Sequence, residues 1–190
     1  MTRYTILLAL LVAATVSFAQ RTIPLNLEQL VKNAGSIVDA TVVKTETGKD
    51  ATSGLLVTWI TLHVNENFYG AENEQYTFKQ YGGEADGIAH YPAHMPRFTI
   101  GERTILFLNA PSKIGMQSPV GLQQGKFIVA AAGTGKFKVL NVTKNPSLYK
   151  GISSRKGMEK SISSYNAEDG SLEYGEFAQL IRSFVQQIKQ

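Results

Sequence analysis

The stretch MPRFTIGERTILFLNA, residues 95–110, decides the fold that we expect of this chain. It ends in the uninterrupted apolar run 104–108, which has the turn signal Gly101-Glu102 before it and Pro111 after it. A short apolar run between turn signals is typical of a strand that is buried on both faces. We therefore expect a central strand here, with the other strands arranged around it.

Further strands are predicted from the patterns on either side. Residues 55–66, LLVTWITLHVNE, alternate between two faces as a half-buried antiparallel strand does. The remaining predicted strands are 36–47, 75–81, 125–132 and 136–142, and the last two are joined by the tight turn Gly133-Thr134-Gly135. The pattern is that of an antiparallel sheet.

Two helices are predicted, one at each end of the sheet. Residues 25–35 begin with Asn26 and Gln29 at the spacing of a capping box and end at Gly35. Near the C-terminus, apolar residues recur at helical spacing, namely Phe177, Leu180, Ile181, Phe184 and Ile188. The expected fold class is thus mostly β, a small antiparallel OB-like barrel with one N-terminal and one C-terminal helix.

The first residues have the pattern of a secretory signal peptide. Arg3 gives a basic start, residues 6–16 are apolar, and Ser17-Phe18-Ala19 places small residues where a signal peptidase reads them. We expect cleavage after Ala19, and a retained N-terminal membrane anchor is the alternative. No other segment is apolar enough to cross a membrane. The expected location is therefore periplasmic or secreted, in a bacterium.

The expected organisation has four parts. They are a signal peptide at 1–19, the barrel domain at 20–142, a polar basic connection at 143–171 and an amphipathic helix at 172–190 packed on the barrel. The connection carries several lysines and arginines against few acids, which predicts an exposed segment.

The composition excludes several kinds of site. The chain has no cysteine, which excludes thiol catalysis and cysteine-ligated metal. Its net charge of +4 over 190 residues is mild and gives no reason to expect a nucleic-acid partner. No serine-elbow or HExxH motif is present, so we assign no catalytic residue and no cofactor.

The long segment 82–96, GGEADGIAHYPAHMP, shows no periodicity, and such loops in compact domains are often functional. We assign five residues in and beside it as candidate contacts with a ligand or partner: Tyr81, His90, Tyr91, His94 and Arg97. Exposed aromatic rings on a sheet can stack on sugars, and the aromatic residues of this region are Tyr69, Tyr76, Phe78, Tyr81 and Tyr91.

A metal site in this loop is a weaker hypothesis. His90 and His94 lie near Glu84 and Asp86, and imidazoles with carboxylates can bind zinc. Pro92 between the two histidines rules out ligation from successive turns of a helix, and no third ligand is fixed by the sequence. We therefore assign no metal ligand.

The order of the elements resembles the netrin-like modules, which include the tissue inhibitors of metalloproteinases. The resemblance covers about residues 25–142 and rests on SIVDATVV at 36–43, the long strand 58–64, Phe68-Tyr69-Gly70, and the strand 103–108 after a glycine turn. It implies an OB-like barrel that engages another protein. The metalloproteinase inhibitors chelate the protease zinc through an N-terminal cysteine, which this chain lacks, so that inhibitory site is not carried over.

A closer resemblance is to a group of exported bacterial proteins with no established activity. The shared pattern is Gly82-Gly83, Met95-Pro96-Arg97-Phe98, Gly101-Glu102 before an apolar strand, and Gln124-Gly125-Lys126-Phe127.

Three function hypotheses follow. The first is an exported non-catalytic binding module that engages another secreted or envelope protein, with a protease as one candidate. The alternative is a module that binds carbohydrate or the cell envelope through its tyrosine-bearing face. The third is a metal-dependent hydrolase with His63, His90 or His94 in its site.

Overall fold

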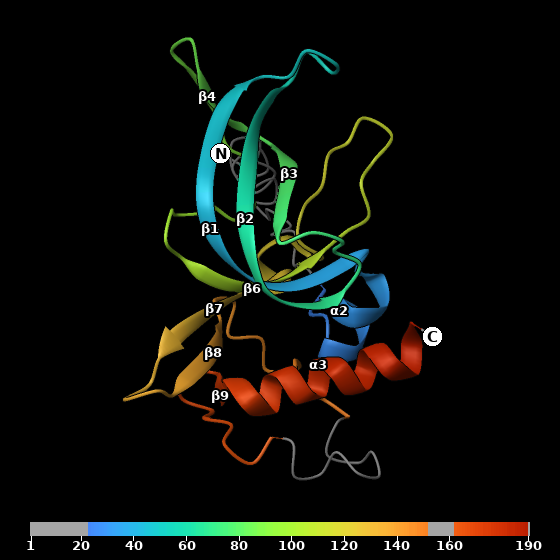
Figure 1. Cartoon of the computed structure of the whole chain (residues 1–190), viewed down its shortest axis with the longest axis vertical. Helices are drawn as coiled ribbons and strands as arrows, with labels where there is room; N and C mark the ends of the chain where they lie inside the picture. The colour runs from blue at the N-terminus through green and yellow to red at the C-terminus, as the bar shows by residue number, and fades with distance from the viewer. Residues whose placement is uncertain (1–22, 152–161, 190) are drawn as a thin grey trace, which may run out of the picture.

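The structure is a computed structural model, which describes residues 23–151 and 162–189. The signal peptide expected at 1–19 lies outside these residues. The described chain is mostly β, with a seven-stranded antiparallel sheet and two helices (Figure 1). The strand order is β3 (Gln75–Tyr81), β2 (Leu56–Tyr69), β1 (Ser36–Lys49), β6 (Arg103–Leu108), β7 (Lys126–Ala131), β8 (Phe137–Asn141) and β9 (Ser171–Glu173).

Strand β6 is the central strand that the sequence predicts. It pairs with β1 on one side and β7 on the other. Ile105 and Phe107 point into one hydrophobic cluster, whereas Leu106 and Leu108 point into another, and all four are fully buried. The prediction of a strand buried on both faces is confirmed.

Two hydrophobic cores therefore lie on opposite faces of the sheet. The first, the helix-side core, is covered by α2 (Leu27–Asn33) and α3 (Tyr174–Ile188), which lie at the lower end of the molecule (Figure 1). The second, the hairpin-side core, is formed mainly by residues of β1, β2 and β3, and it contains Phe78. The β1–β2 pair has register shifts, which are β-bulges or similar irregularities, and β-bulges bend the strand that carries them.

Both predicted helices are confirmed. At the start of α2 the backbone N–H of Gln29 donates to Asn26 Oδ1, and the N–H of Asn26 donates to Gln29 Oε1, each at 2.9 Å. This is the expected capping box. Helix α3 buries four of the five residues of the predicted apolar stripe, of which Phe177 and Phe184 are the largest, and the fifth, Ile188, is partly buried.

The expected closure into an OB-like barrel is not seen in residues 23–151 and 162–189. Strands β3 and β9 stand at opposite ends of the sheet order and do not pair with each other, so the sheet is open. Strand β9 has three residues and runs directly into α3. A loop lies along the outer edge of β3, where the N–H of Gln117 donates to the carbonyl of Lys79 at 2.7 Å.

The predicted connection 143–171 is not exposed throughout its described part. Leu148 belongs to the helix-side core, and its carbonyl accepts a hydrogen bond from the N–H of Leu27 at 2.9 Å. Asn145 is also buried and donates through Nδ2 to the carbonyl of Leu25 at 2.7 Å. These contacts hold residues 145–148 against the start of α2.

Candidate functional site

The segment 82–96 contains a short hairpin that the sequence analysis does not predict. Strands β4 (Gly83–Ala85) and β5 (Ile88–His90) pair antiparallel around Asp86-Gly87. Both turn residues have positive φ, 53° and 74°, as a type I′ turn requires. The signal was present in the sequence, because Asp-Gly is a preferred pair for this turn.

Two glycines allow the hairpin to lie against the tip of β1 and β2. A Cβ at Gly83 would stand 2.9 Å from Thr58 Oγ1, and a Cβ at Gly82 would stand 2.6 Å from Pro92 Cδ. The Thr58 hydroxyl donates to the carbonyl of Gly82 at 2.7 Å, and the Thr47 hydroxyl donates to the carbonyl of Glu84 at 2.5 Å. The hairpin is thus fixed in place by close packing and by two side chains of the main sheet.

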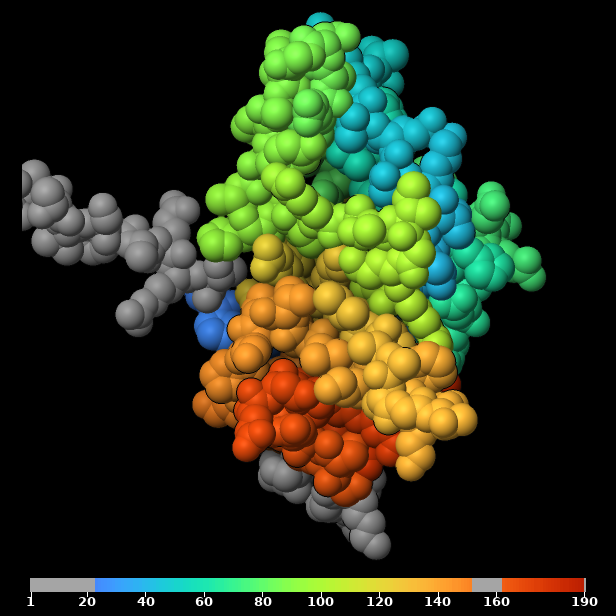
Figure 2. Space-filling view, turned by 90° about the vertical axis from the view of Figure 1, so that its left-hand side faces the viewer, coloured from blue at the N-terminus to red at the C-terminus, as the bar shows by residue number. Residues whose placement is uncertain are grey.

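Four of the five predicted contact residues lie together around this hairpin. With Ile88 they form what we call the hairpin surface: Tyr81, Ile88, His90, Tyr91 and Arg97. Ile88 is 66% exposed, Tyr91 44% and Tyr81 37%. The Arg97 guanidinium stacks 4.0 Å from the centre of the Tyr91 ring, and the rings of Tyr81 and His90 are 5.2 Å apart. In Figure 2 the green residues of this region form the upper end of the molecule beside the cyan tip of β1–β2.

A pocket of ≈180 Å³ lies under the hairpin surface, and we call it the hairpin pocket. Tyr81, Tyr91 and Arg97 line it together with Thr45, Gln80 and Met95. Gln80 is 6% exposed; its Nε2 donates to the carbonyl of Pro96 at 2.9 Å, whereas its Oε1 has no hydrogen-bond partner among the described residues. Apolar and aromatic walls with a few polar groups are typical of binding pockets.

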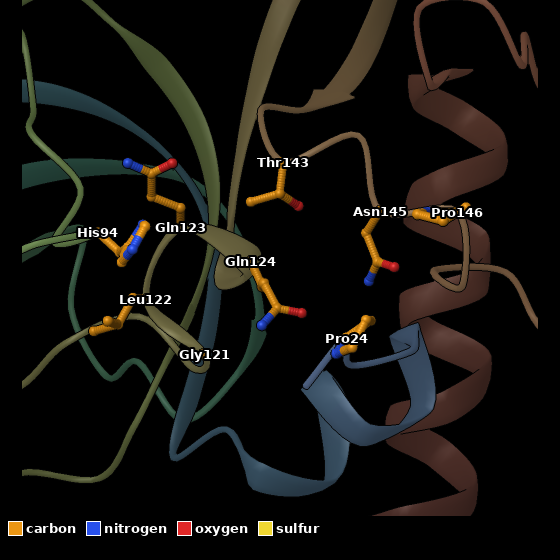
Figure 3. Close-up of a pocket in the computed structure, with 9 residues that line it drawn as sticks. All are labelled: Pro24, His94, Gly121, Leu122, Gln123, Gln124, Thr143, Asn145 and Pro146. Atoms are coloured by element: carbon orange, nitrogen blue, oxygen red, sulfur yellow. The ribbon is translucent and has the colours of Figure 1, made fainter. Parts of the chain in front are cut away.

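His94, the fifth predicted residue, lines a different pocket. This second pocket, which we call the amide pocket, has a volume of ≈210 Å³ (Figure 3). His94 lies there beside Leu122 and Gln123, with Gln124 and Asn145 on the opposite wall. His90 and His94 therefore belong to different surfaces. Across residues 23–151 and 162–189, no group of three or more His, Cys, Asp or Glu side chains is placed to hold a metal ion.

An ionic network around the buried Asp39, which we did not predict from the sequence, joins the sheet to α3. Asp39 is fully buried; it accepts hydrogen bonds from Arg103 and, at 2.7 Å, from the Tyr174 hydroxyl. That hydroxyl also lies 3.0 Å from Glu66 Oε2, and Glu66 pairs with Arg182 of α3. Burial and the nearby carboxylates raise the pKa of the Tyr174 hydroxyl above its usual range.

One feature of the sequence could have indicated this network: a single acidic residue, Asp39, within an apolar strand. Asp39 lies within residues 36–43, SIVDATVV, where every other residue is apolar or small and uncharged. A buried carboxylate needs a partner. The sequence does not show that Arg103 and Tyr174 supply it, because they lie 64 and 135 residues away. The network lines neither pocket, and we interpret it as structural.

Comparisons of the chain with family models, curated proteins and solved structures find no match. The two family resemblances therefore stay predictions.

Within the described ranges, the helices are all too short or too polar to span a membrane. His63, the remaining candidate of the hydrolase hypothesis, is exposed on β2 and lines neither the hairpin pocket nor the amide pocket.

Proposed function

We propose that this chain is an exported, non-catalytic binding module that engages another secreted or envelope protein through its hairpin surface. The observation that carries the proposal is the exposure of Ile88 on the hairpin and of Tyr91 directly after it, where close packing holds the hairpin in place. Exposed apolar and aromatic side chains gathered at one place favour an interaction site, and a preformed site loses less entropy on binding. The netrin-like resemblance of residues 25–142 supports the same proposal, with a protease as one candidate partner.

The chemistry of the hairpin surface suits a protein partner. Tyrosine and arginine are enriched among the residues that contribute most to protein–protein binding. Arg97 is exposed, stacks on Tyr91, and has no acidic partner among the described residues. Its guanidinium can therefore pair with a carboxylate of the partner while Ile88 and Tyr91 bury apolar area.

Site-specific cross-linking tests this proposal. A photoreactive residue is placed at Ile88, and the protein is incubated with the secreted and envelope fraction of its host. Val142, which is 46% exposed and lies outside the hairpin surface, is the matched control position. We expect one dominant adduct from position 88 that is lost with Tyr91→Ala and Arg97→Ala. No adduct from position 88, or the same adduct from both positions, would refute the proposal.

A second candidate function is carbohydrate binding through the tyrosine-bearing face. Tyr81 and Tyr91 are exposed beside the hairpin pocket and favour it. The other three aromatic residues of this face offer less, since Phe78 is buried and Tyr69 and Tyr76 are half-buried. Retention on polysaccharide columns, lost with Tyr81→Ala and Tyr91→Ala, is the expected result.

A further inference from the structure

The amide pocket shares no lining residue with the hairpin pocket. Its walls come from four parts of the chain: the segment before α2, the loop at His94, the turn around Gly121 and the turn after β8 (Figure 3). Side chains of the last two parts hold the segment before α2 in place. Gln124 Oε1 accepts from the N–H of Leu25 at 2.7 Å, and Asn145 Nδ2 donates to the carbonyl of Leu25 at 2.7 Å. The pocket is therefore built by specific contacts.

Backbone strain is concentrated at this pocket. Four non-glycine residues in the described part of the chain have positive φ. Two of them line the amide pocket, His94 at 61° and Leu122 at 59°, and a third, Lys144 at 46°, lies between the lining residues Thr143 and Asn145. Positive φ is unfavourable for side chains of this size, and such residues gather at ligand sites.

The polar side chains of the pocket are amides, one hydroxyl and one imidazole. None of the lining residues is an acid, a lysine or an arginine. The Gln123 amide and the His94 imidazole have no side-chain hydrogen-bond partner among the described residues, whereas Gln124 and Asn145 are already engaged. An amide offers both donors and an acceptor, and the two ring nitrogens of an imidazole also take part in hydrogen bonds.

The apolar part of the lining limits the choice of ligand further. Pro24, Leu122 and Pro146 present aliphatic surface, and no phenylalanine, tyrosine or tryptophan lines the pocket, so a ligand here is recognised by hydrogen bonds and aliphatic contact rather than by stacking on an aromatic ring. The volume of ≈210 Å³ has room for one small ring. We infer that the amide pocket binds a neutral, hydroxyl-rich ligand of the size of a single sugar ring, with Gln123 and His94 bonding its hydroxyls.

Ligand-observed NMR and calorimetry with defined probes test this inference. The probes are methyl glucoside and N-acetylglucosamine, with glucuronate and glucosamine as charged analogues. We expect a neutral probe to bind with a Kd of about 1 mM and the charged analogues to bind more weakly. Gln123→Ala and His94→Gly should each weaken binding about tenfold, since each removes one hydrogen-bonding partner.

The variants are chosen to keep the fold. Glycine accepts the positive φ of residue 94, so His94→Gly removes the imidazole without new strain. Gln186→Ala, on the exposed side of α3, is the control for Gln123→Ala and should bind as the parent does. Absence of binding by both neutral probes at millimolar concentration would overturn the inference, as would unchanged binding by the Gln123→Ala, His94→Gly double variant.

Ligand binding in the amide pocket can be tested separately from partner binding at the hairpin surface. The amide-pocket variants should leave the adduct from position 88 unchanged, because they alter no residue of the hairpin surface. If N-acetylprolinamide bound while both sugars did not, the pocket would be a peptide site and the inference would be wrong.

Discussion

Arg103 holds the fully buried carboxylate of Asp39 with two hydrogen bonds, 3.1 Å from Nε to Oδ1 and 2.6 Å from Nη2 to Oδ2. The same guanidinium stacks on the Tyr174 ring, 4.9 Å from its centre. The pairing with Asp39 raises the pKa of Arg103. One side chain on the central strand thus neutralises a buried charge and orients the first residue of α3.

Replacing Arg103 by Met should lower the free energy of unfolding by about 3–5 kcal/mol, because it leaves the Asp39 carboxylate buried without a cation. Adding Asp39→Asn should recover part of this loss. Arg182→Met is the matched control: its pair with Glu66 is more exposed, so we expect a loss below about 1 kcal/mol. Urea denaturation measures the free energy of unfolding of the parent, the two single arginine variants and the double variant. Equal losses of this free energy in the two single arginine variants would contradict the prediction.

The turn before β9 should make stability depend on pH in acid. Hydrogen bonds from Ser171 and then Lys138 lower the pKa of Asp169 from its ordinary 3.8 to about 2. A lowered pKa in the folded state contributes stability that is complete above pH 3.8 and is lost as the pH falls towards 2. Denaturation of the parent and Asp169→Asn across this range should show a shallower decline for the variant. Parallel curves would show that Asp169 makes no such contribution.

Gly83→Ala should disturb the hairpin, because the new Cβ would stand 2.9 Å from Thr58 Oγ1 and 3.0 Å from the carbonyl of Val57. Overpacking of this kind costs about 1–3 kcal/mol. We expect faster hydrogen exchange in residues 83–90 and a weaker adduct from position 88. Gly175→Ala is the control, because this glycine has open space around its Cβ and no positive φ, and the change should leave exchange in the hairpin unchanged.

Tyr91→Ala should weaken binding of the cross-linked partner about 30-fold, as loss of about 2 kcal/mol at a central contact does. Its effect on the free energy of unfolding should stay within about 0.5 kcal/mol, because Tyr91 is exposed. Arg97→Ala should act similarly, and the double variant should lose less than the sum, since the two side chains stack. Calorimetry with the purified partner measures each loss, and a strictly additive pair would argue against a joint contact.

Local patterns in the sequence predicted the elements but not all of their assembly. The unbroken apolar run of β6 and the helical spacing of the apolar residues on α3 are both local patterns that indicate burial, so both elements were predicted correctly. Closure of the barrel depends on pairing between the ends of the sheet, β3 and β9, and no local pattern encodes that pairing. The division of the candidate site has the same origin, since the turn from Pro92 to Met95 separates Tyr91, at the hairpin pocket, from His94, at the amide pocket.

Strand β1 contributes to both cores: Ile37 packs with the helices, whereas Val38 and Ala40 pack with β2 and β3. Neither core can come apart without moving this backbone. The single tryptophan, Trp59, lies in β2, far along the chain from α3. Its fluorescence and the helical circular dichroism should therefore be lost at one urea concentration, as in a two-state transition. A disturbance of the helices therefore reaches the hairpin-side core, on the other face of the sheet, through strand β1.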